Sequence, residues 1–317
     1  MKKLLTFIVI FCIAAFADEP ITTLKVLSIG NSFSNNAHRY LAEIIKQHGK
    51  ATAVLGNASI GGCSFKRHWD EHLKSVADPK HKPYRYKGNP MNLSEYLTAE
   101  TWDIVTIQSV SHESFKPQLW QPYADNIVAL IKELAPQAKI YIHRTWAYRP
   151  DNKKFFGPQK NNFSAQLMYE QSGAAYKALS EKLHAPMVPS GEALWTAFQE
   201  QPVKNVSPDP NFDYNNPVHP NLPKDEGALI KGYYWRKDAK TQEWKFTFDG
   251  IHANSRGEYL LGCTWYAYFF KQDIDDLAWQ PKDVTPEDAK FLHSLTSKRY
   301  CWRRNSSSVS LPSLTKE

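Results

Sequence analysis

The sequence predicts an α/β protein, a three-layer α/β/α sandwich built on a five-stranded parallel sheet. Two observations lead to this prediction. Short apolar runs rich in strand-forming residues recur along the chain, and segments with helical periodicity separate them. Alternating strands and helices imply parallel strands joined by right-handed crossovers, with helices on both faces of the sheet. We therefore expect functional residues just beyond the carboxyl ends of the strands.

Short segments along the chain have the composition of buried strands. The first, residues 24–29, is apolar and ends at Gly30. The others, each separated from the one before by room for a helix, are residues 51–55, 103–107, 139–142 and 186–188.

Apolar residues at helical spacing lie between these strands. Residues 36–48 place Leu41, Ile44 and Ile45 on one face, and Gly49 follows, a residue type that commonly ends helices. The same spacing recurs in further sets that predict helices: Phe65, Trp69, Leu73 and Val76; Ile127, Leu130, Ile131 and Leu134; Ala175, Leu179 and Leu183. A last apolar helix is predicted over residues 259–270.

Residues 201–248 interrupt this alternation. Residues 201–224 are rich in Pro, Asn and Asp, which predicts an irregular insertion, and residues 232–248 alternate aromatic and polar side chains around a turn, which predicts a hairpin. Long loops in compact domains are often functional. We expect one domain over residues 18–300 that contains this insertion, followed by a Ser-rich, disordered tail over residues 301–317.

The amino terminus has the pattern of a secretory signal peptide over residues 1–17. Two lysines precede a short apolar run, and residues 15–17 fit an A-x-A cleavage site. The expected protein is secreted or periplasmic, with no stable membrane anchor after cleavage. Its 39 basic and 32 acidic residues give a formal charge of +7 but no dense basic run, so we expect no nucleic-acid partner. Cleavage would leave Cys63, Cys263 and Cys301, which allow at most one internal disulfide.

A serine directly follows the first predicted strand. Residues 30–34 read Gly-Asn-Ser-Phe-Ser and lead into a helix, so Ser32 is expected at the sheet edge, where a helix amino terminus favours negative charge. This is a suitable position for a nucleophile. The alternative interpretation is that Ser32 or Ser34 only caps the helix.

A second motif precedes the last predicted helix. Residues 249–252 read Asp-Gly-Ile-His, and an Asp three residues before a His can accept the imidazole Nδ1 proton. Nε2 is then free to take a proton from a serine. The same spacing occurs at Asp78 and His81 in a polar stretch, which we interpret as a chance match.

Together these motifs resemble those of the SGNH (GDSL-like) hydrolase family. The Gly-Asn-Ser-Phe-Ser segment is similar to its first block, with Asn in place of the usual Asp, and Asp-Gly-Ile-His is similar to its last block. A glycine after the second strand, Gly62, matches the second block. The resemblance spans residues 24–270 and implies a flavodoxin-like fold, a triad of Ser32, Asp249 and His252, and no metal or organic cofactor.

The resemblance also implies an oxyanion hole. Its donors would be the backbone N–H groups of Ser32 and Gly62 and a side-chain amide after the third strand. The family usually supplies an Asn there, whereas this chain has Gln108, which carries the same amide donor. We expect Gln108 to take this role, with Ser111 and His112 as alternates. Gln108 could instead satisfy only the loop backbone.

These features predict an exported serine esterase that hydrolyses O-acyl (acetyl) groups on a carbohydrate, either a small molecule or a polysaccharide. Three side chains are expected at the substrate site: His68, which follows the second block, and Trp146 and Tyr148, which follow the fourth strand. Aromatic rings flanked by polar groups suit sugar rings, although they also suit packing.

Two alternatives remain open. The changed third block could mark a carbohydrate-binding protein on a hydrolase-like scaffold. In addition, residues 68–72 read His-Trp-Asp-Glu-His, the H-x-x-E-H pattern in which His68 and His72 would bind zinc and Glu71 would act as the base of a metallopeptidase. A third zinc ligand would have to come from elsewhere in the chain.

Overall fold

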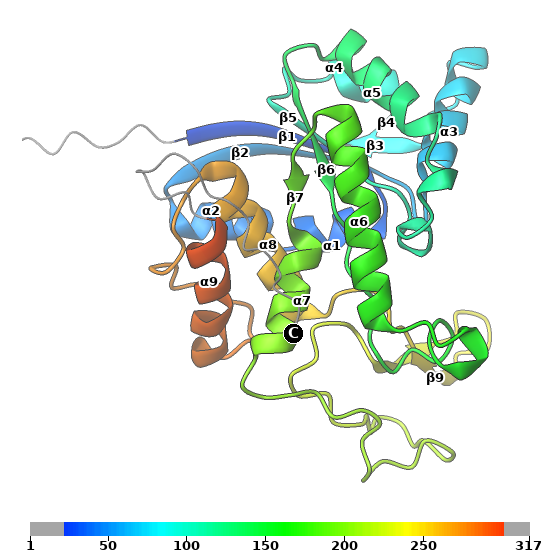
Figure 1. Ribbon diagram of the computed structural model, residues 1–317, viewed down its shortest axis with the longest axis vertical. Helices are drawn as coiled ribbons and strands as arrows, with labels where there is room; N and C mark the ends of the chain where they lie inside the picture. Colours follow the sequence, from blue (N-terminus) through cyan, green and yellow to red (C-terminus); the bar gives the residue numbers. More distant parts are fainter. Residues whose placement is uncertain (1–21, 301–317) are drawn as a thin grey trace, which may run out of the picture.

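The computed structural model describes residues 22–300 of the 317-residue chain, with side chains up to residue 296. The expected signal peptide, the expected tail and Cys301 lie outside the described residues. A sheet of five parallel strands forms the centre, in the order β2-β1-β5-β6-β7 (Figure 1). This is the flavodoxin-like strand order, so the predicted fold class is confirmed. The strands are β1 (Thr22–Gly30), β2 (Ala51–Ser59), β5 (Ile104–Ile107), β6 (Lys139–His143) and β7 (Met187–Val188).

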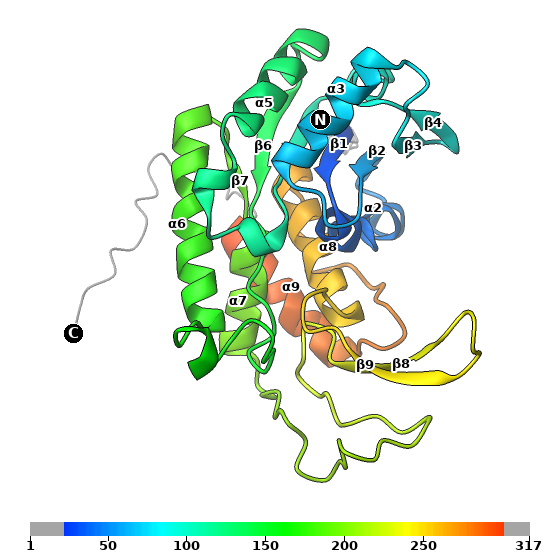
Figure 2. The same ribbon diagram turned by 90° about the vertical axis from the view of Figure 1, so that its right-hand side faces the viewer.

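Helices cover both faces of the sheet (Figures 1 and 2). One face carries α1 (Ser32–His38), α2 (Leu41–His48), α7 (Ser190–Glu200), α8 (Ser255–Phe270) and α9 (Pro286–Tyr300). The other carries α3 (Phe65–Ala77), α4 (Leu93–Thr98), α5 (Tyr123–Leu134) and α6 (Ala165–Leu183). Strand β1 alternates between the two cores, because Val26 packs with the first set and Leu27 with the second.

The predicted helix over residues 36–48 is in fact two helices. Helix α1 begins at Ser32, directly after β1, and α2 begins only at Leu41. The side chain of Asn31 caps α1 by accepting a hydrogen bond from the Phe33 N–H at 3.0 Å. The apolar pattern missed α1 because short polar residues are typical of caps and weak in helix interiors.

The apolar stripe that predicts α3 marks its buried face only in the first half of the helix, at Phe65 and Trp69. Leu73 is 48% exposed and Val76 is 67% exposed, whereas His68, His72 and Ser75 are buried. Polar side chains can be buried where they find hydrogen-bond partners. Hydropathy alone therefore indicates the helix but not which way it faces.

The insertion between α7 and α8 begins with irregular chain and continues as an antiparallel hairpin of β8 (Tyr233–Lys237) and β9 (Trp244–Phe248), as predicted. On one side of this hairpin Tyr233 stacks on Phe246, with ring centroids 4.7 Å apart. In Figure 2 the insertion lies beyond the arrowheads of the central strands. A small hairpin of β3 (Tyr84–Tyr86) and β4 (Asn89–Met91) was not predicted. Short 3-10 helices occupy the loops after β5 and β6: η1 (Ser111–Glu113), η2 (Pro117–Leu119) and η3 (Pro158–Lys160).

Within residues 22–300, no helix combines the length and the apolar character that a bilayer crossing requires. Cys63 and Cys263 are both buried and do not pair with each other. Burial raises the pKa of the Cys63 thiol to about 12, so this thiol stays protonated at neutral pH.

Buried histidines make the stability of this fold depend on pH. Burial lowers the pKa of His68 from 6.5 to about 4 and that of His143 to about 3. Below about pH 6.5 the unfolded chain therefore binds protons that the folded chain does not take up. The free energy of unfolding is highest above this pH and decreases as the pH falls toward 4.

We expect the free energy of unfolding to decrease by about 2 kcal/mol per buried histidine between about pH 7 and about pH 5. Urea unfolding at the two pH values measures this difference. Both ring nitrogens of His143 lack a hydrogen-bond partner, so His143→Phe loses no such bond and should show a smaller pH effect than the wild type. Equal stability of the wild type at both pH values would contradict the expectation.

Candidate active site

Ser32 and His252 come together although they lie 220 positions apart in the sequence. Ser32 is the first residue of α1, and His252 lies in the loop that leads into α8. The Oγ of Ser32 is 2.8 Å from Nε2 of His252, and both residues are partly exposed. Helix α1 also contacts the His252 ring directly, because the Phe33 ring meets it edge-on with ring centroids 6.0 Å apart.

Asp249 holds the far side of the His252 ring. Its Oδ2 is 2.9 Å from Nδ1 of His252, and its Oδ1 accepts the backbone N–H groups of Ile251 and His252, each at 2.9 Å. Burial opposes ionisation of Asp249, but the hydrogen bonds from His252 outweigh it and hold the pKa of this carboxyl below its ordinary value. Because a carboxylate only accepts, Nδ1 carries the proton and Nε2 presents its lone pair to Ser32.

Two neighbouring segments position the His252 loop. From the insertion, the Lys231 N–H donates to the His252 carbonyl at 2.8 Å. From α1, Asn36 Oδ1 accepts the Ala253 N–H at 3.3 Å, while its Nδ2 donates to Glu258 at 2.6 Å. Sequence reasoning missed Asn36. Its place one turn after Ser32 on the same helix is the signal that could have found it.

The loop after β2 lies against the serine turn. The Ile60 N–H donates to the Gly30 carbonyl at 3.2 Å, and Asn31 Nδ2 donates to the Cys63 carbonyl at 2.9 Å. Gly62, between them, is exposed and has a φ of +60°, a conformation that favours glycine. In the described part of the chain, the N–H groups of Ser32 and Gly62 have no hydrogen-bond acceptor. The serine turn and the loop packed against it therefore each keep one backbone donor without a protein acceptor.

Gln108, the expected side-chain donor of the oxyanion hole, is buried beside the serine turn. Its side chain is 1% exposed, and its Nε2 donates to Asn31 Oδ1 at 2.8 Å. Its Oε1 is also buried and has no partner. Of the alternates, Ser111 is buried and hydrogen-bonded to Tyr148, and His112 is exposed on η1. The amide is the right chemical group, but the packing of the loop uses it internally.

Trp146 and Tyr148, both expected at the substrate site, are almost entirely buried. Trp146 is 1% exposed, stacks on Phe33 with centroids 3.9 Å apart, and donates its indole N–H to the Ile251 carbonyl at 3.0 Å. Tyr148 is 2% exposed, and its hydroxyl lies 2.8 Å from Ser111 Oγ. Large rings gain most from burial, and here they support the turns that carry Ser32 and His252.

His68, also expected at the substrate site, is buried against the serine turn. Its Nε2 is 3.0 Å from the Gly30 carbonyl, and its Nδ1 is 2.9 Å from the Tyr84 hydroxyl. Because a carbonyl only accepts, Nε2 carries the proton, and Nδ1 accepts from Tyr84. Both nitrogens of this ring are therefore already hydrogen-bonded, and His68 acts as a support for the residue two positions before Ser32.

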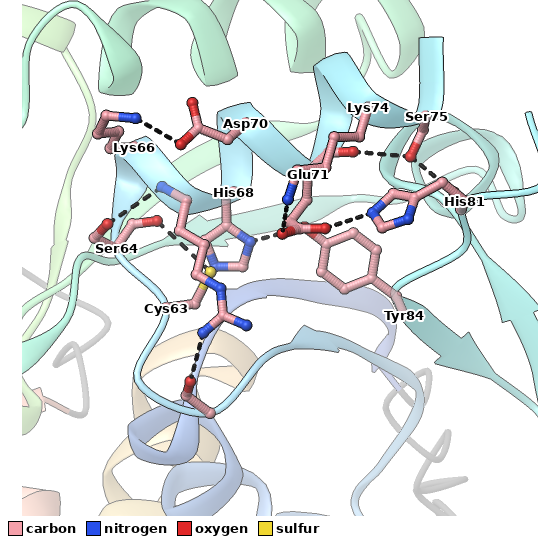
Figure 3. Close-up of polar contacts among 12 residues, drawn as sticks. Cys63, Ser64, Lys66, His68, Asp70, Glu71, Lys74, Ser75, His81 and Tyr84 are labelled. Atoms are coloured by element: carbon pink, nitrogen blue, oxygen red, sulfur yellow. Dashed lines mark hydrogen bonds and ion pairs between the residues drawn. The ribbon is translucent and has the colours of Figure 1, made fainter. Parts of the chain in front are cut away.

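Glu71 of the H-x-x-E-H motif is also engaged within the protein (Figure 3), whereas Nδ1 of His72 is buried without a hydrogen-bond partner among the described residues. Glu71 accepts a hydrogen bond from Lys74 at 2.9 Å and contacts His81. Among residues 22–296, no group of three or more His, Cys, Asp and Glu side chains is arranged to hold a metal ion. The spacing that resembles a zinc motif produces a structural hydrogen-bond network on α3.

Asn31 joins the loops around the serine turn. Its Nδ2 donates to the carbonyls of Cys63 and Ser109 at 2.9 and 3.4 Å, and its Oδ1 accepts from Phe33 N–H and Gln108 Nε2. Both halves of the amide are used. The sequence does carry a signal for this role, because the family that the chain resembles usually has Asp at this position. A carboxylate would place an oxygen against two carbonyl oxygens.

We therefore expect Asn31→Asp to lower the free energy of unfolding by about 1–3 kcal/mol, the usual cost of leaving buried polar groups without partners. Urea unfolding measures the effect. Asn35→Asp is the matched control, because Asn35 is exposed and its Oδ1 accepts a hydrogen bond from Asn57. An Asn31→Asp protein as stable as the wild type would show that the amide nitrogen does not hold these loops.

Comparison with known protein families identifies the family of this chain. The family model described as "Domain of unknown function (DUF4886)" matches residues 25–201, more than half of the sequence. The chain belongs to the DUF4886 family. The matched residues of this DUF4886 protein include Ser32 and Gly62 and end before Asp249 and His252. No curated protein shows significant sequence similarity to it.

Solved structures with a similar fold are also found. The DUF4886 protein is similar to the crystal structure of a DUF4886 family protein from Bacteroides uniformis, with a TM-score of 0.61 and 22% identity over 87% of this chain and 94% of that chain. This likeness shows a shared fold. A Clostridium thermocellum family 3 carbohydrate esterase gives a TM-score of 0.41 at 12% identity, covering 81% of this chain and 98% of that chain. A member of the lipolytic protein G-D-S-L family from Veillonella parvula gives 0.41 at 9% identity, covering 79% and 100%.

Proposed function

We propose that this DUF4886 protein is a serine hydrolase that cleaves ester bonds. The observation that carries the proposal is the chain of contacts from Ser32 Oγ to His252 Nε2 at 2.8 Å, and from His252 Nδ1 to Asp249 Oδ2 at 2.9 Å. A serine hydroxyl is a weak nucleophile at neutral pH and needs an adjacent base, which a third group orients. This arrangement supplies each of these parts.

In the proposed reaction Ser32 Oγ attacks the acyl carbon while His252 Nε2 takes its proton. Asp249 keeps the ring oriented and stabilises the imidazolium that forms. The N–H groups of Ser32 and Gly62 would hold the negative oxygen of the tetrahedral intermediate, and the amino terminus of α1 adds favourable charge. The proton then passes to the leaving alcohol, and water, activated by His252, releases the acid from Ser32.

We further propose that the ester is an O-acyl group on a carbohydrate and that the protein is secreted or periplasmic. The location rests on the signal-peptide pattern of residues 1–17. The substrate class rests on the hairpin β8–β9, which joins the triad through a hydrogen bond from the Asp249 N–H to the Gly232 carbonyl at 3.1 Å. Exposed tyrosine and tryptophan on this hairpin suit sugar rings.

One observation favours a second candidate, a carbohydrate-binding protein without catalysis. Gln108 is engaged with Asn31, so the oxyanion would have only backbone donors. Losing one such donor typically costs about a hundredfold or more in rate. A slow enzyme remains the better proposal because the Ser32, His252 and Asp249 contacts are complete.

A fluorophosphonate probe and p-nitrophenyl acetate test the proposal. We expect the wild-type protein to be labelled and to hydrolyse the ester, with no effect of EDTA, because His68 already uses both ring nitrogens within the protein. No labelling between about pH 5 and about pH 9 would favour the binding protein, since an oriented His–Ser pair reacts within this range. Hydrolysis abolished by EDTA would favour a metal-dependent reaction.

A further inference from the structure

An open groove lies beside the triad, between the hairpin and the segment that carries Asp249. It has a volume of about 460 Å³, within the range of small-molecule sites. Its lining residues are Asp225, Lys231, Gly232, Tyr233, Tyr234, Asp249 and Asn254. A ligand in this groove would touch the residue that orients the catalytic base.

The acidic groups of the groove already have partners. Asp225 forms an ion pair with Arg149, with Oδ1 and Nη1 2.5 Å apart. Asp249 is bonded to His252. The amide of Asn254 is also engaged, because it donates to the Ala228 carbonyl and accepts from the Gly257 N–H, each at 2.9 Å. Each of these acids is therefore already bonded within the protein, and neither is paired with Lys231.

Lys231, unlike the acidic residues of the groove, has no side-chain partner in the part of the chain that the structure describes. Its backbone is held on both sides, by the bond to the His252 carbonyl at 2.8 Å and by a bond from the Gly250 N–H at 3.0 Å. Its side chain is exposed, and among the described residues no carboxylate forms an ion pair with its ammonium group. The carboxyl group of Glu258 interacts electrostatically with Lys231, but the two groups lie beyond ion-pair distance. Glu258 accepts a hydrogen bond from Asn36 instead. The groove therefore has one positive charge without a partner. Lys231 directly follows Ile230, which forms an antiparallel bridge with Ala253.

Tyr234 supplies an aromatic wall. It pairs with Thr247 across the hairpin and is 38% exposed. Alternation along β8 places it on the opposite face from Tyr233, whose ring stacks on Phe246. No ring of the described residues stacks on Tyr234. A free tyrosine ring beside an unpaired cation suits a ligand with an apolar ring face and a negative charge.

The geometry points to a binding site for an acidic sugar, in which Lys231 pairs with the carboxylate of a uronic acid and Tyr234 stacks on its ring. A single lysine matches the single charge of a carboxylate, whereas a phosphate dianion would need further donors. Binding of the acidic sugar does not depend on the proposed function. The further statement that the hydrolysed substrates are O-acylated acidic saccharides does rest on it.

Binding of non-acylated sugars tests the groove without relying on catalysis. The probes are the methyl glycosides of glucuronic acid and of glucose, which differ only at C6, and ligand-observed NMR with the full-chain protein measures their affinities. We expect the glucuronide to bind about fivefold more tightly, the scale of an exposed ion pair. The preference should decrease in about 0.5 M NaCl, because salt screens exposed charges.

Two variants test whether Lys231 causes the preference for the glucuronide. Lys231→Met removes the charge but keeps a long, unbranched side chain, and it should remove the preference for the glucuronide. Lys240→Met is the matched control, because Lys240 is an exposed lysine in the turn of the same hairpin and does not line the groove. Equal affinity of the wild type for the two glycosides, or a preference that persists in Lys231→Met, would overturn the inference.

Acetylated forms of the same two glycosides connect the groove to hydrolysis. We expect the ratio of kcat/KM for the acidic ester over the neutral ester to fall about fivefold in Lys231→Met and to stay unchanged in Lys240→Met. Selective binding without hydrolysis or fluorophosphonate labelling would support the groove and contradict the proposed function. Hydrolysis of both esters at a ratio insensitive to Lys231→Met would overturn the inference and leave the proposed function standing.

Discussion

Ser32→Ala is expected to lower the rate of ester hydrolysis by about 10⁴-fold or more, the scale seen when a triad nucleophile is removed. The Ser32 hydroxyl lies 2.8 Å from His252 Nε2 and is the group this base can activate. Without it, only direct attack by water remains, assisted by the oxyanion donors. The same change should abolish labelling by a fluorophosphonate probe, because that probe forms its bond to the activated oxygen.

Ser34→Ala is the matched control for this experiment. Ser34 belongs to the same Gly-Asn-Ser-Phe-Ser segment, but it is buried and donates to the Asn31 carbonyl at 2.7 Å. We expect the Ser34→Ala protein to keep its labelling, and peptide mapping of the labelled wild type to identify Ser32. Labelling that survives in Ser32→Ala would mean that another residue is the nucleophile.

Asp249→Asn is expected to lower kcat/KM for p-nitrophenyl acetate by about 10³–10⁴-fold. An amide oxygen can still accept the backbone N–H groups of Ile251 and His252, so the loop should keep its shape. The amide nitrogen, however, donates toward Nδ1 of His252. The ring then carries its proton on Nε2 and cannot accept the Ser32 proton.

The chain contains a matched control for this change as well. Asp78 stands three residues before His81, the same spacing as Asp249 and His252, but it is exposed and accepts the Lys80 N–H at 2.9 Å. His81 instead contacts Glu71. We expect Asp78→Asn to leave kcat/KM unchanged, with thermal unfolding confirming that both variants are folded. An Asp249→Asn protein with the wild-type rate would show that His252 does not need a carboxylate.

The meeting of Ser32 and His252 could be predicted from the sequence because it depends on topology. Ser32 follows a buried strand, and the carboxyl ends of parallel strands lie at one edge of the sheet. His252 precedes an apolar helix that has to pack on the same sheet. The spacing of Asp249 and His252 then determines which ring nitrogen faces the carboxylate. These are local patterns and general rules of parallel sheets, which residue types alone reveal.

The roles of Gln108, Trp146, Tyr148 and His68 could not be predicted in the same way. Each has suitable chemistry and lies near the right sheet edge, yet each is buried and hydrogen-bonded or stacked within the protein. Whether a side chain at a strand end meets solvent or a neighbouring loop depends on how the loops pack. Hydropathy carries little information on this point for polar and aromatic residues, as the buried histidines of α3 show.

The sequence by itself therefore determined the parallel sheet and the residues that approach one another at its edge, because hydrophobic periodicity and connection rules act through residue type. Only the tertiary structure decided which donors remain free, which aromatic rings are covered, and that Lys231 stands without a partner beside Asp249. Hydrogen bonds and ion pairs form between groups distant in the chain. Their partners become known only when the loops are in place.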